Sequence, residues 1–262
     1  MVQISLIPEK IIDIGSLHIT NTLLMSWLIT IAISIFAILF SRTIKNTPGK
    51  LQNIVEAFIE ALLDFFEMIV GNRDTVKRFF PLVGTIFIFI LVANWSGLIP
   101  GLSSLGIVEH EGEEQFVIPA LRSVYSDINM TLALALIVIV TTQVVGLKTL
   151  GRKYISKFID FRGPIKFFTG ILESISEISK IISFTFRLFG NVFAGEVLLV
   201  SMAALVAYAV PIPFLFLEIL VGLIQALIFS ILLVVYFTIG ASDHAEEHEG
   251  HEEPAEHKLA SV

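Results

Sequence analysis

The sequence contains no cysteine and few charged residues. Cysteine is absent from all 262 residues, which excludes disulfides and thiolate metal sites. Only 16% of the residues are charged and 55% are hydrophobic, with a mean hydropathy of +0.85. A soluble domain of this length needs far more charge to cover its surface. The first residues, MVQISLIPEK, also lack the basic start and the cleavage site of a signal peptide. The composition predicts an integral membrane protein.

Long apolar runs predict five membrane-spanning helices. About 20 apolar residues are needed to cross a hydrocarbon core roughly 30 Å thick. The runs cover residues 21–40, 79–99, 128–146, 165–207 and 213–240. The fourth run is longer than a perpendicular span and carries many polar groups, so we expect a steeply tilted or broken helix packed against protein. The expected fold class is an all-α integral membrane protein whose last two helices form a long, tilted hairpin.

The distribution of basic residues between the spans predicts the orientation. The first long connection carries Arg42, Lys45, Lys50, Arg73, Lys77 and Arg78. The third carries Lys148, Arg152, Lys153, Lys157, Arg162 and Lys166. Residues 103–126, between them, hold four glutamates and a single basic residue, Arg122. By the positive-inside rule the two basic connections are cytoplasmic. The N-terminus is therefore expected outside and the C-terminus inside.

Residues 51–70 have the pattern of an amphipathic helix in the first cytoplasmic connection. Glu56, Glu60, Asp64 and Glu67 recur at spacings of four, four and three residues, which places them on one helix face. A lipid-surface anchor would carry Lys and Arg there instead. We interpret the segment as a helix that docks on a partner or lies at the membrane surface; the alternative is a solvated face.

The C-terminal segment, residues 241–262, is acidic and rich in histidine. His244, His248 and His251 have spacings that could bind a metal on a helix. The segment is almost devoid of apolar residues and contains Pro254. That composition favours disorder, so we predict a disordered cytoplasmic tail and no metal site.

Ionisable residues within the fourth span are its most informative feature. Such groups are costly in a membrane and by default mark an ion pathway. Glu173, Lys180 and Arg187 are seven residues apart and Asn191 is four beyond, so they form one polar stripe. Lys180 can pair with Glu173 or Glu177 in a structural network. Arg187 has no acid three or four residues away, and its guanidinium is always charged. It therefore requires a partner on another helix or chain.

Two further acids lie near the end of the fourth span and in the fifth. Glu196 is nine residues beyond Arg187, so it points to the opposite side of the helix, roughly 13 Å further along. Glu218 and Gln225 are seven residues apart and share a face of the last helix. Glu196 and Glu218 could face each other across the helix pair as a proton-accepting site separate from Arg187. The alternative is a pair of structural acids held by hydroxyl groups.

Four motifs, in order, carry a resemblance to a known family. They are FRLFGN at residues 186–191 continuing into VFAGE, NWSGLIPG at 94–101, SDINMTL at 126–132, and Gln225 with Ala226. Together they resemble subunit a of F-type ATP synthases of the bacterial type. The resemblance extends from the first span to Gly240. It implies a proton-translocating stator subunit, non-catalytic itself, that forms two offset aqueous half-channels and couples proton flow to rotation of the c-ring.

The resemblance also implies roles for individual residues. Arg187 matches the stator arginine that faces the c-ring carboxylates. Glu196 and Glu218 match a proton-transfer pair, although many bacterial members have His where this chain has Glu218. Further polar positions expected along the proton path are Asn191, Gln225 and Ser183, with Asp127 and Asn129 at the channel mouth. The implied partners are the c-ring, the peripheral-stalk subunit b and the lipid of a bacterial inner membrane, without nucleic acid or cofactor.

Other functions fit the residues less well. A secondary transporter also places charges at mid-membrane, but transporters commonly show internal repeats, and none is evident here. A membrane scaffold would not require an unpaired arginine. Gly-x-Ser-x-Gly and His-Glu-x-x-His motifs are absent, which argues against a protease. The chain also lacks a phosphate-binding P-loop, so ATP chemistry is expected on partner subunits.

Overall fold

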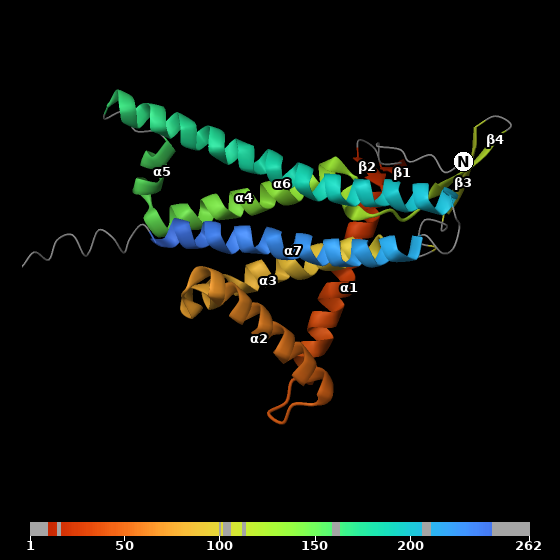
Figure 1. Cartoon of the computed structure of the whole chain (residues 1–262), viewed down its shortest axis with the longest axis horizontal. Coiled ribbons are helices and arrows are strands. Elements are labelled where there is room, and N and C mark those ends of the chain that lie inside the picture. Colours follow the sequence, from red (N-terminus) through yellow and green to blue (C-terminus); the bar gives the residue numbers. More distant parts are fainter. Residues whose placement is uncertain are drawn as a thin grey trace, which may run out of the picture.

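The computed structural model describes residues 10–14, 17–99, 101, 106–111, 114–158, 163–205 and 211–242. The tail with His244, His248 and His251 lies outside this range, so its predicted disorder remains a prediction. Five described helices are long and apolar enough to cross a membrane. They are α1 (Asn21–Thr43), α3 (Arg73–Ser96), α4 (Ile128–Leu150), α6 (Pro164–Leu205) and α7 (Pro211–Ser242). The all-α membrane fold predicted from the composition is confirmed (Figure 1).

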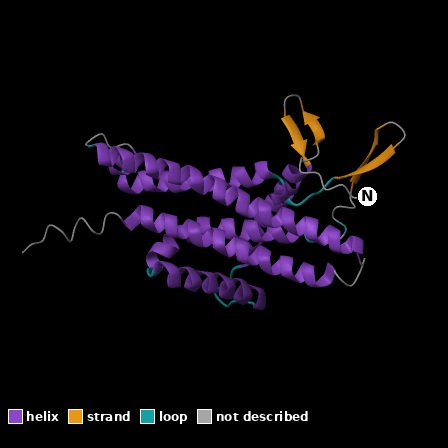
Figure 2. Ribbon diagram, turned by 45° about the horizontal axis from the view of Figure 1, so that its top comes forward, coloured by secondary structure: helices purple, strands orange, loops and turns teal. Residues whose placement is uncertain are grey.

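The remaining elements lie before the first span and between the spans. Helix α2 (Lys50–Val70) lies between α1 and α3, and α5 (Arg152–Phe158) joins α4 to α6. Two antiparallel hairpins, β1 (Lys10–Ile14) with β2 (Leu17–Thr20) and β3 (Gly106–Glu111) with β4 (Glu114–Pro119), lie at one end of the helices (Figure 2). A 3₁₀ turn, η2 (Val124–Ser126), leads from β4 into α4. The hydropathy analysis did not predict the hairpins, because strands of four to six residues leave little signal beside long apolar helices.

Helix α6 is continuous over 42 residues. At about 1.5 Å per residue it is roughly 60 Å long, about twice the thickness of a hydrocarbon core. Because the helix is unbroken, tilting rather than a break must accommodate its length in a membrane. Figure 1 shows α6 alongside α7 near the hairpins and diverging from it toward α5.

Capping residues fix several helix boundaries. Gly71 ends α2 in the left-handed conformation, with φ of 77°, and its N–H donates to the Glu67 carbonyl. The next residue, Asn72, begins α3 by accepting hydrogen bonds from the N–H groups of Asp74 and Thr75. Gly at a C-terminal cap and Asn at an N-terminal cap are the preferred residues for these conformations. The chain therefore reverses between α2 and α3 within two residues.

The core is centred on the packing of α3 against α7. Phe87 and Ile90 of α3 and Phe229 and Leu233 of α7 are all at most 1% exposed. Two hydrogen bonds join the same helices: the buried Asn94 side chain donates to the Gly222 carbonyl at 3.2 Å, and the exposed Trp95 indole donates to the Ile219 carbonyl at 3.1 Å. Apolar packing and side chain-to-backbone bonds thus hold α7 in one register on α3.

Replacing Gly222 with valine is expected to destabilise this packing. A Cβ at Gly222 would lie 3.1 Å from the Asn94 Cβ and 3.5 Å from the Trp95 ring, so α3 and α7 would have to separate. Overpacking of this kind costs about 1–3 kcal/mol. We expect a thermal unfolding midpoint in detergent several degrees below wild type, with Ile224→Val as the control because Ile224 is 43% exposed. An unchanged midpoint for Gly222→Val would contradict the tight packing.

Candidate functional site

A small cavity lies among α3, α6, α7 and the segment before η2, and we call it the carboxylate cavity. It measures about 30 Å³. Its polar lining comprises Asn94, Ser123, Asn191, Glu196 and Glu218. The Asn94 Oδ1 and Ser123 Oγ atoms are buried without a hydrogen-bond partner. Buried polar atoms of this kind normally bond to ordered water, and the cavity is large enough for at least one molecule.

The structure brings Glu196 and Glu218 to the same cavity from two helices. Glu196 forms an ion pair with Arg122, with 3.3 Å between Nη2 and Oε2. Glu218 lies against Gly195, and a Cβ added at Gly195 would overlap the Glu218 carboxylate. The absence of a side chain at Gly195 therefore makes room for this carboxylate.

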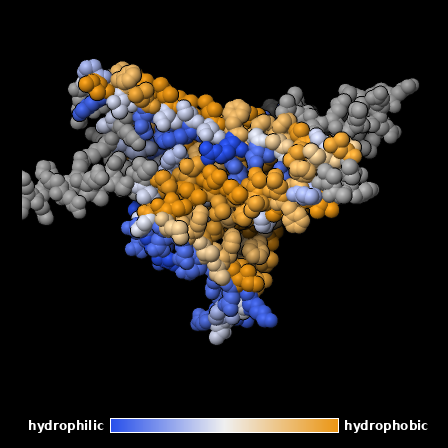
Figure 3. Space-filling view, viewed as in Figure 1, coloured by the Kyte–Doolittle hydropathy of each residue, from blue (hydrophilic) through white to orange (hydrophobic). Residues whose placement is uncertain are grey.

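A second cavity, the arginine pocket, lies between α6 and α7 on the side toward α5. It measures about 330 Å³. Its lining combines three serines and two cations with an aromatic and apolar wall: Ser176, Ser179, Lys180, Ser183, Phe184, Arg187, Leu232 and Tyr236. Figure 3 shows hydrophilic side chains over this part of α6, bordered by apolar side chains in the middle of the view.

Arg187 has only weak contacts with the residues that the structure describes. Its Nη2 lies 3.4 Å from the Ser183 hydroxyl, and its guanidinium carbon is 5.9 Å from the centre of the Phe184 ring. Throughout the part of the chain that the structure describes, no carboxylate lies within ion-pair distance of Arg187. The side chain is exposed, so its charge is available to a partner outside this chain.

Fully buried apolar residues separate the two cavities along both helices. On α6, Leu188 is 0% exposed and lies between the residues that line the two cavities. On α7, Ala226 and Phe229 occupy the corresponding interval and are at most 1% exposed. Gln225 lies in the same interval, 6% exposed, with its Nε2 unpartnered. The close-packed apolar side chains of this interval hinder protons, because protons move along water or polar groups.

A polar network borders the arginine pocket on the α5 side. Lys180 pairs with Glu177 at 2.6 Å, and its Nζ lies 4.6 Å from the Tyr236 ring. Glu177 accepts a hydrogen bond from Gln143 at 2.9 Å, and the Tyr154 hydroxyl donates to Gln143 at 2.8 Å. Burial, with smaller effects of the carboxylates of Glu177 and Glu173, raises the pKa of Tyr154 to about 12. Its hydroxyl therefore keeps its proton at neutral pH, and the network joins α4, α5, α6 and α7.

Asp127 and Asn129 lie at the start of α4. The Asp127 carboxylate accepts hydrogen bonds from the Thr22 hydroxyl at 3.0 Å and from the Asn129 N–H at 2.8 Å. Asp127 is 3% exposed, and these hydrogen bonds cap α4 and tie it to α1. Neither residue lines the two cavities. Their place at a channel mouth stays a prediction.

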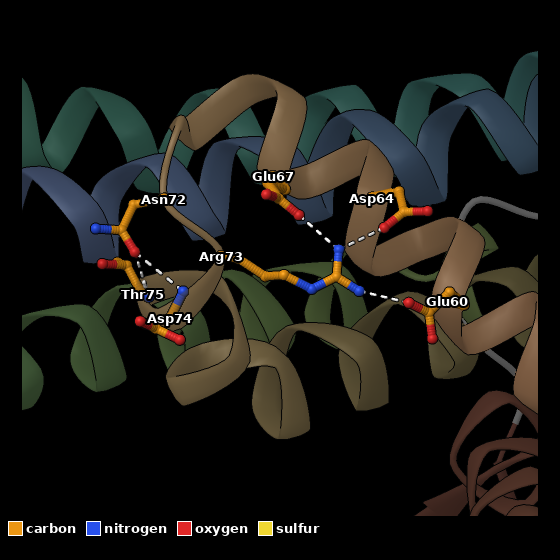
Figure 4. A network of polar contacts seen from close by, with 7 residues as sticks. All are labelled: Glu60, Asp64, Glu67, Asn72, Arg73, Asp74 and Thr75. Carbon is orange, nitrogen blue, oxygen red and sulfur yellow. Dashed lines mark hydrogen bonds and ion pairs between the residues drawn. The ribbon is translucent and has the colours of Figure 1, made fainter.

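The acids of α2 converge on a residue of their own chain. Figure 4 shows the Arg73 guanidinium between Glu60, Asp64 and Glu67, at 2.5–2.6 Å from each carboxylate. The fourth acid, Glu56, accepts a hydrogen bond from Gln52. The acidic face thus holds α2 against the start of α3, whereas the apolar side chains of Leu51, Ile54 and Met68 are 60–83% exposed.

Sequence reasoning missed Arg122 as a site residue. It was noted only as the single cation of an acidic connection, and its partner Glu196 is 74 residues away. Its signal was its place, four residues before Ser126, where the polar SDIN segment begins. Long-range pairing of this kind requires the fold, because the connection brings η2 against α6.

The fold and the two cavities define a multi-pass membrane protein with ionisable side chains between its helices, an arrangement that marks ion pathways. The chain belongs to the family described as ATP synthase A chain, whose model matches residues 23–238. Family membership bears out the resemblance seen in the motifs, and nothing in the comparisons supports a secondary transporter.

Several relatives are similar over most of their length. ATP synthase subunit a from Geotalea daltonii is 37% identical over 214 residues, covering 80% of this chain and 83% of the relative. The protein of the same name from Geotalea uraniireducens is 36% identical, covering 84% and 89%. A chloroplastic ATP synthase subunit a from Stigeoclonium helveticum is 34% identical, covering 86% and 85%.

Proposed function

We propose that this chain is the proton-translocating, non-catalytic subunit of an ATP synthase membrane sector. The observation that carries the proposal is the separation of the carboxylate cavity from the arginine pocket by buried residues of α6 and α7. Two cavities that do not meet are what two offset half-channels require. Family membership supports the same function, and ATP chemistry is assigned to other subunits because the sequence lacks a P-loop.

Proton transfer follows from the chemistry of the two cavities. A proton from outside reaches the carboxylate cavity and passes from there to a carboxyl group on the rotating c-ring. The neutral carboxyl can enter lipid, whereas an ionised one is costly there. After almost a full turn it releases its proton toward the arginine pocket. Arg187 stabilises the ionised carboxylate between these events and denies protons a direct route. Each charge that crosses releases about 2.3 kcal/mol per 100 mV.

The c-ring is assigned to the exposed apolar face of α6. Ile175, Ile178, Ile182 and Phe186 recur at helical spacing and are 52–58% exposed, next to Arg187. An apolar face beside an available cation suits an apolar ring that carries carboxylates. The peripheral-stalk subunit b is a further expected partner. The basic connections place the N-terminus outside and the arginine pocket toward the cytoplasm, in a bacterial inner membrane.

Disulfide cross-linking tests this assignment. We expect a cysteine at Ile182 to form a disulfide with a cysteine placed beside the ring carboxylate, because Ile182 is exposed one turn before Arg187. The control is Ile35→Cys on α1, which is 52% exposed and equally apolar. Cross-linking at position 182 but not at 35 supports the ring interface. Equal cross-linking at both positions, or none at 182, would overturn it.

A further inference from the structure

The ion pair between Arg122 and Glu196 distinguishes the two acids of the carboxylate cavity. Arg122 approaches from the segment before η2, and its side chain is 12% exposed; that of Glu196 is 26% exposed. A guanidinium is always charged, and a largely buried charge needs its counter-ion. The Arg122 guanidinium therefore favours the ionised form of Glu196. For Glu218, no ion pair or hydrogen bond is found among the residues that the structure describes.

We propose that Arg122 is a positioning residue that keeps Glu196 ionised, so that Glu218 alone carries the exchangeable proton of this cavity. The inference rests on the proposed function and deepens it, because it divides the roles of two carboxylates that look equivalent in the sequence. Arg122 with Glu196 forms a neutral unit beside Glu218. The proton passes between water in the cavity and the Glu218 carboxylate.

The surroundings of the cavity contain few other charges. Its remaining polar lining comprises Asn94, Ser123 and Asn191, none of which titrates near neutral pH. The nearest acid in the chain after Arg122 is Asp127, whose carboxylate is bonded to Thr22 and Asn129. Charge balance in the cavity therefore depends on Arg122, Glu196 and Glu218. The unpartnered Asn94 Oδ1 and Ser123 Oγ give water two places to bind on the way to Glu218.

Single substitutions that break the neutral unit should shift the pH dependence of proton pumping in opposite directions. Arg122→Gln leaves two unpaired carboxylates together, and two such groups resist simultaneous ionisation. Glu218 then holds its proton more tightly, so the pH profile moves toward alkaline pH by about one unit. Glu196→Gln leaves an unpaired guanidinium that favours ionised Glu218, so the profile moves toward acidic pH. Arg122→Gln with Glu196→Gln removes both charges and should restore a profile close to wild type.

The experiment measures ATP-driven acidification of inverted membrane vesicles between pH 6 and 9, about the range in which such shifts are visible. Each variant is compared at equal amounts of assembled complex, and Arg122→Lys is included because it preserves the charge. Opposite shifts with a restored double variant, and a pumping rate reduced at least tenfold in Glu218→Gln, are the expected results. A double variant as inactive as Glu218→Gln would mean that Glu196 carries the proton and would overturn the inference, as would an unshifted Arg122→Gln.

The outcomes also separate this inference from the proposed function. Wild-type vesicles that do not pump protons with ATP would contradict the function itself. Wild-type pumping together with variants that do not follow the charge pattern would overturn only the roles of Arg122 and Glu196. If Arg122→Gln fails to assemble, the double variant and Glu218→Gln still decide between the two acids, because the double variant leaves no unpaired charge in the cavity.

Discussion

Replacing Gly195 with alanine is expected to reduce ATP-driven proton pumping by up to about 100-fold, because a misplacement of about 1 Å at a reacting group can cost that much in rate. The Cβ of an alanine at this position would overlap the Glu218 carboxylate. That carboxylate ends a flexible side chain, so it can move away while the helices stay in place. The expected defect is therefore loss of proton transfer at Glu218 with normal assembly of the complex.

Gly190 provides the matched control for this substitution. It lies on the same helix, five residues earlier, and an added Cβ there meets no atom of the chain within 4 Å. Both substitutions add one methyl group and the same gain in helix propensity. Pumping by inverted vesicles, normalised to the amount of chain in the membrane, should fall for Gly195→Ala and change little for Gly190→Ala. Equal activity of the two variants would show that Gly195 does not position Glu218.

Much of the fold follows from the sequence because apolar length is a direct signal of membrane spans. Helices α1, α4 and α7 contain their predicted runs entirely, whereas α3 ends three residues before its predicted end and α6 is described to Leu205, two residues before its predicted end. The ends of these helices are harder to predict, because capping residues determine where each helix begins and ends. Helix α3 begins at Arg73, six residues before the predicted span, since Asn72 caps it and its first turns carry charge. Hydropathy detects the buried or lipid-facing part of a helix and not its polar extension.

The candidate site was predictable in part. Helical spacing alone separated Arg187 from Glu196, and the structure places them at two different cavities. The same spacing did not locate Asn191, which lines the carboxylate cavity with Glu196 although it is only one turn from Arg187. Asn94 reaches the cavity, and Arg122 reaches Glu196, from other elements. Their contribution depends on tertiary packing, which the periodicity of a single helix does not predict.

The role of the acidic face of α2 could be predicted only in part, for a different reason. Its spacing indicated a helix correctly, but an acidic stripe has the same pattern whether it meets water, a partner or its own chain. The structure supplies the partner, Arg73, which is only six residues beyond Glu67. Arg73 is also one of the basic residues that predict the orientation, and it counts equally there whether or not it is paired. The number of basic residues in a connection predicts its side of the membrane, but it does not predict which acids those residues pair with.

Replacing Arg187 with alanine is expected to abolish coupled proton transport. The residue is exposed on α6 beside the arginine pocket and pairs with no carboxylate in the described part of the chain. Without its charge, the ionised ring carboxylate has no counter-ion as it passes, and ionised groups are costly in a membrane. Arg187→Lys should not restore full activity, because an ammonium group lacks the planar, delocalised fork of a guanidinium. Arg42→Ala, which removes an exposed arginine near the end of α1, is the control.

The central claim is tested most directly by measuring ATP-driven acidification of inverted membrane vesicles that carry Arg187→Ala. ATP hydrolysis by the detached catalytic sector is measured in parallel. We expect acidification to fall to background in the variant, whereas the detached sector still hydrolyses ATP and Arg42→Ala vesicles pump like wild type. Undiminished acidification by Arg187→Ala would show that the arginine is structural and would contradict the assignment of the arginine pocket to proton transport.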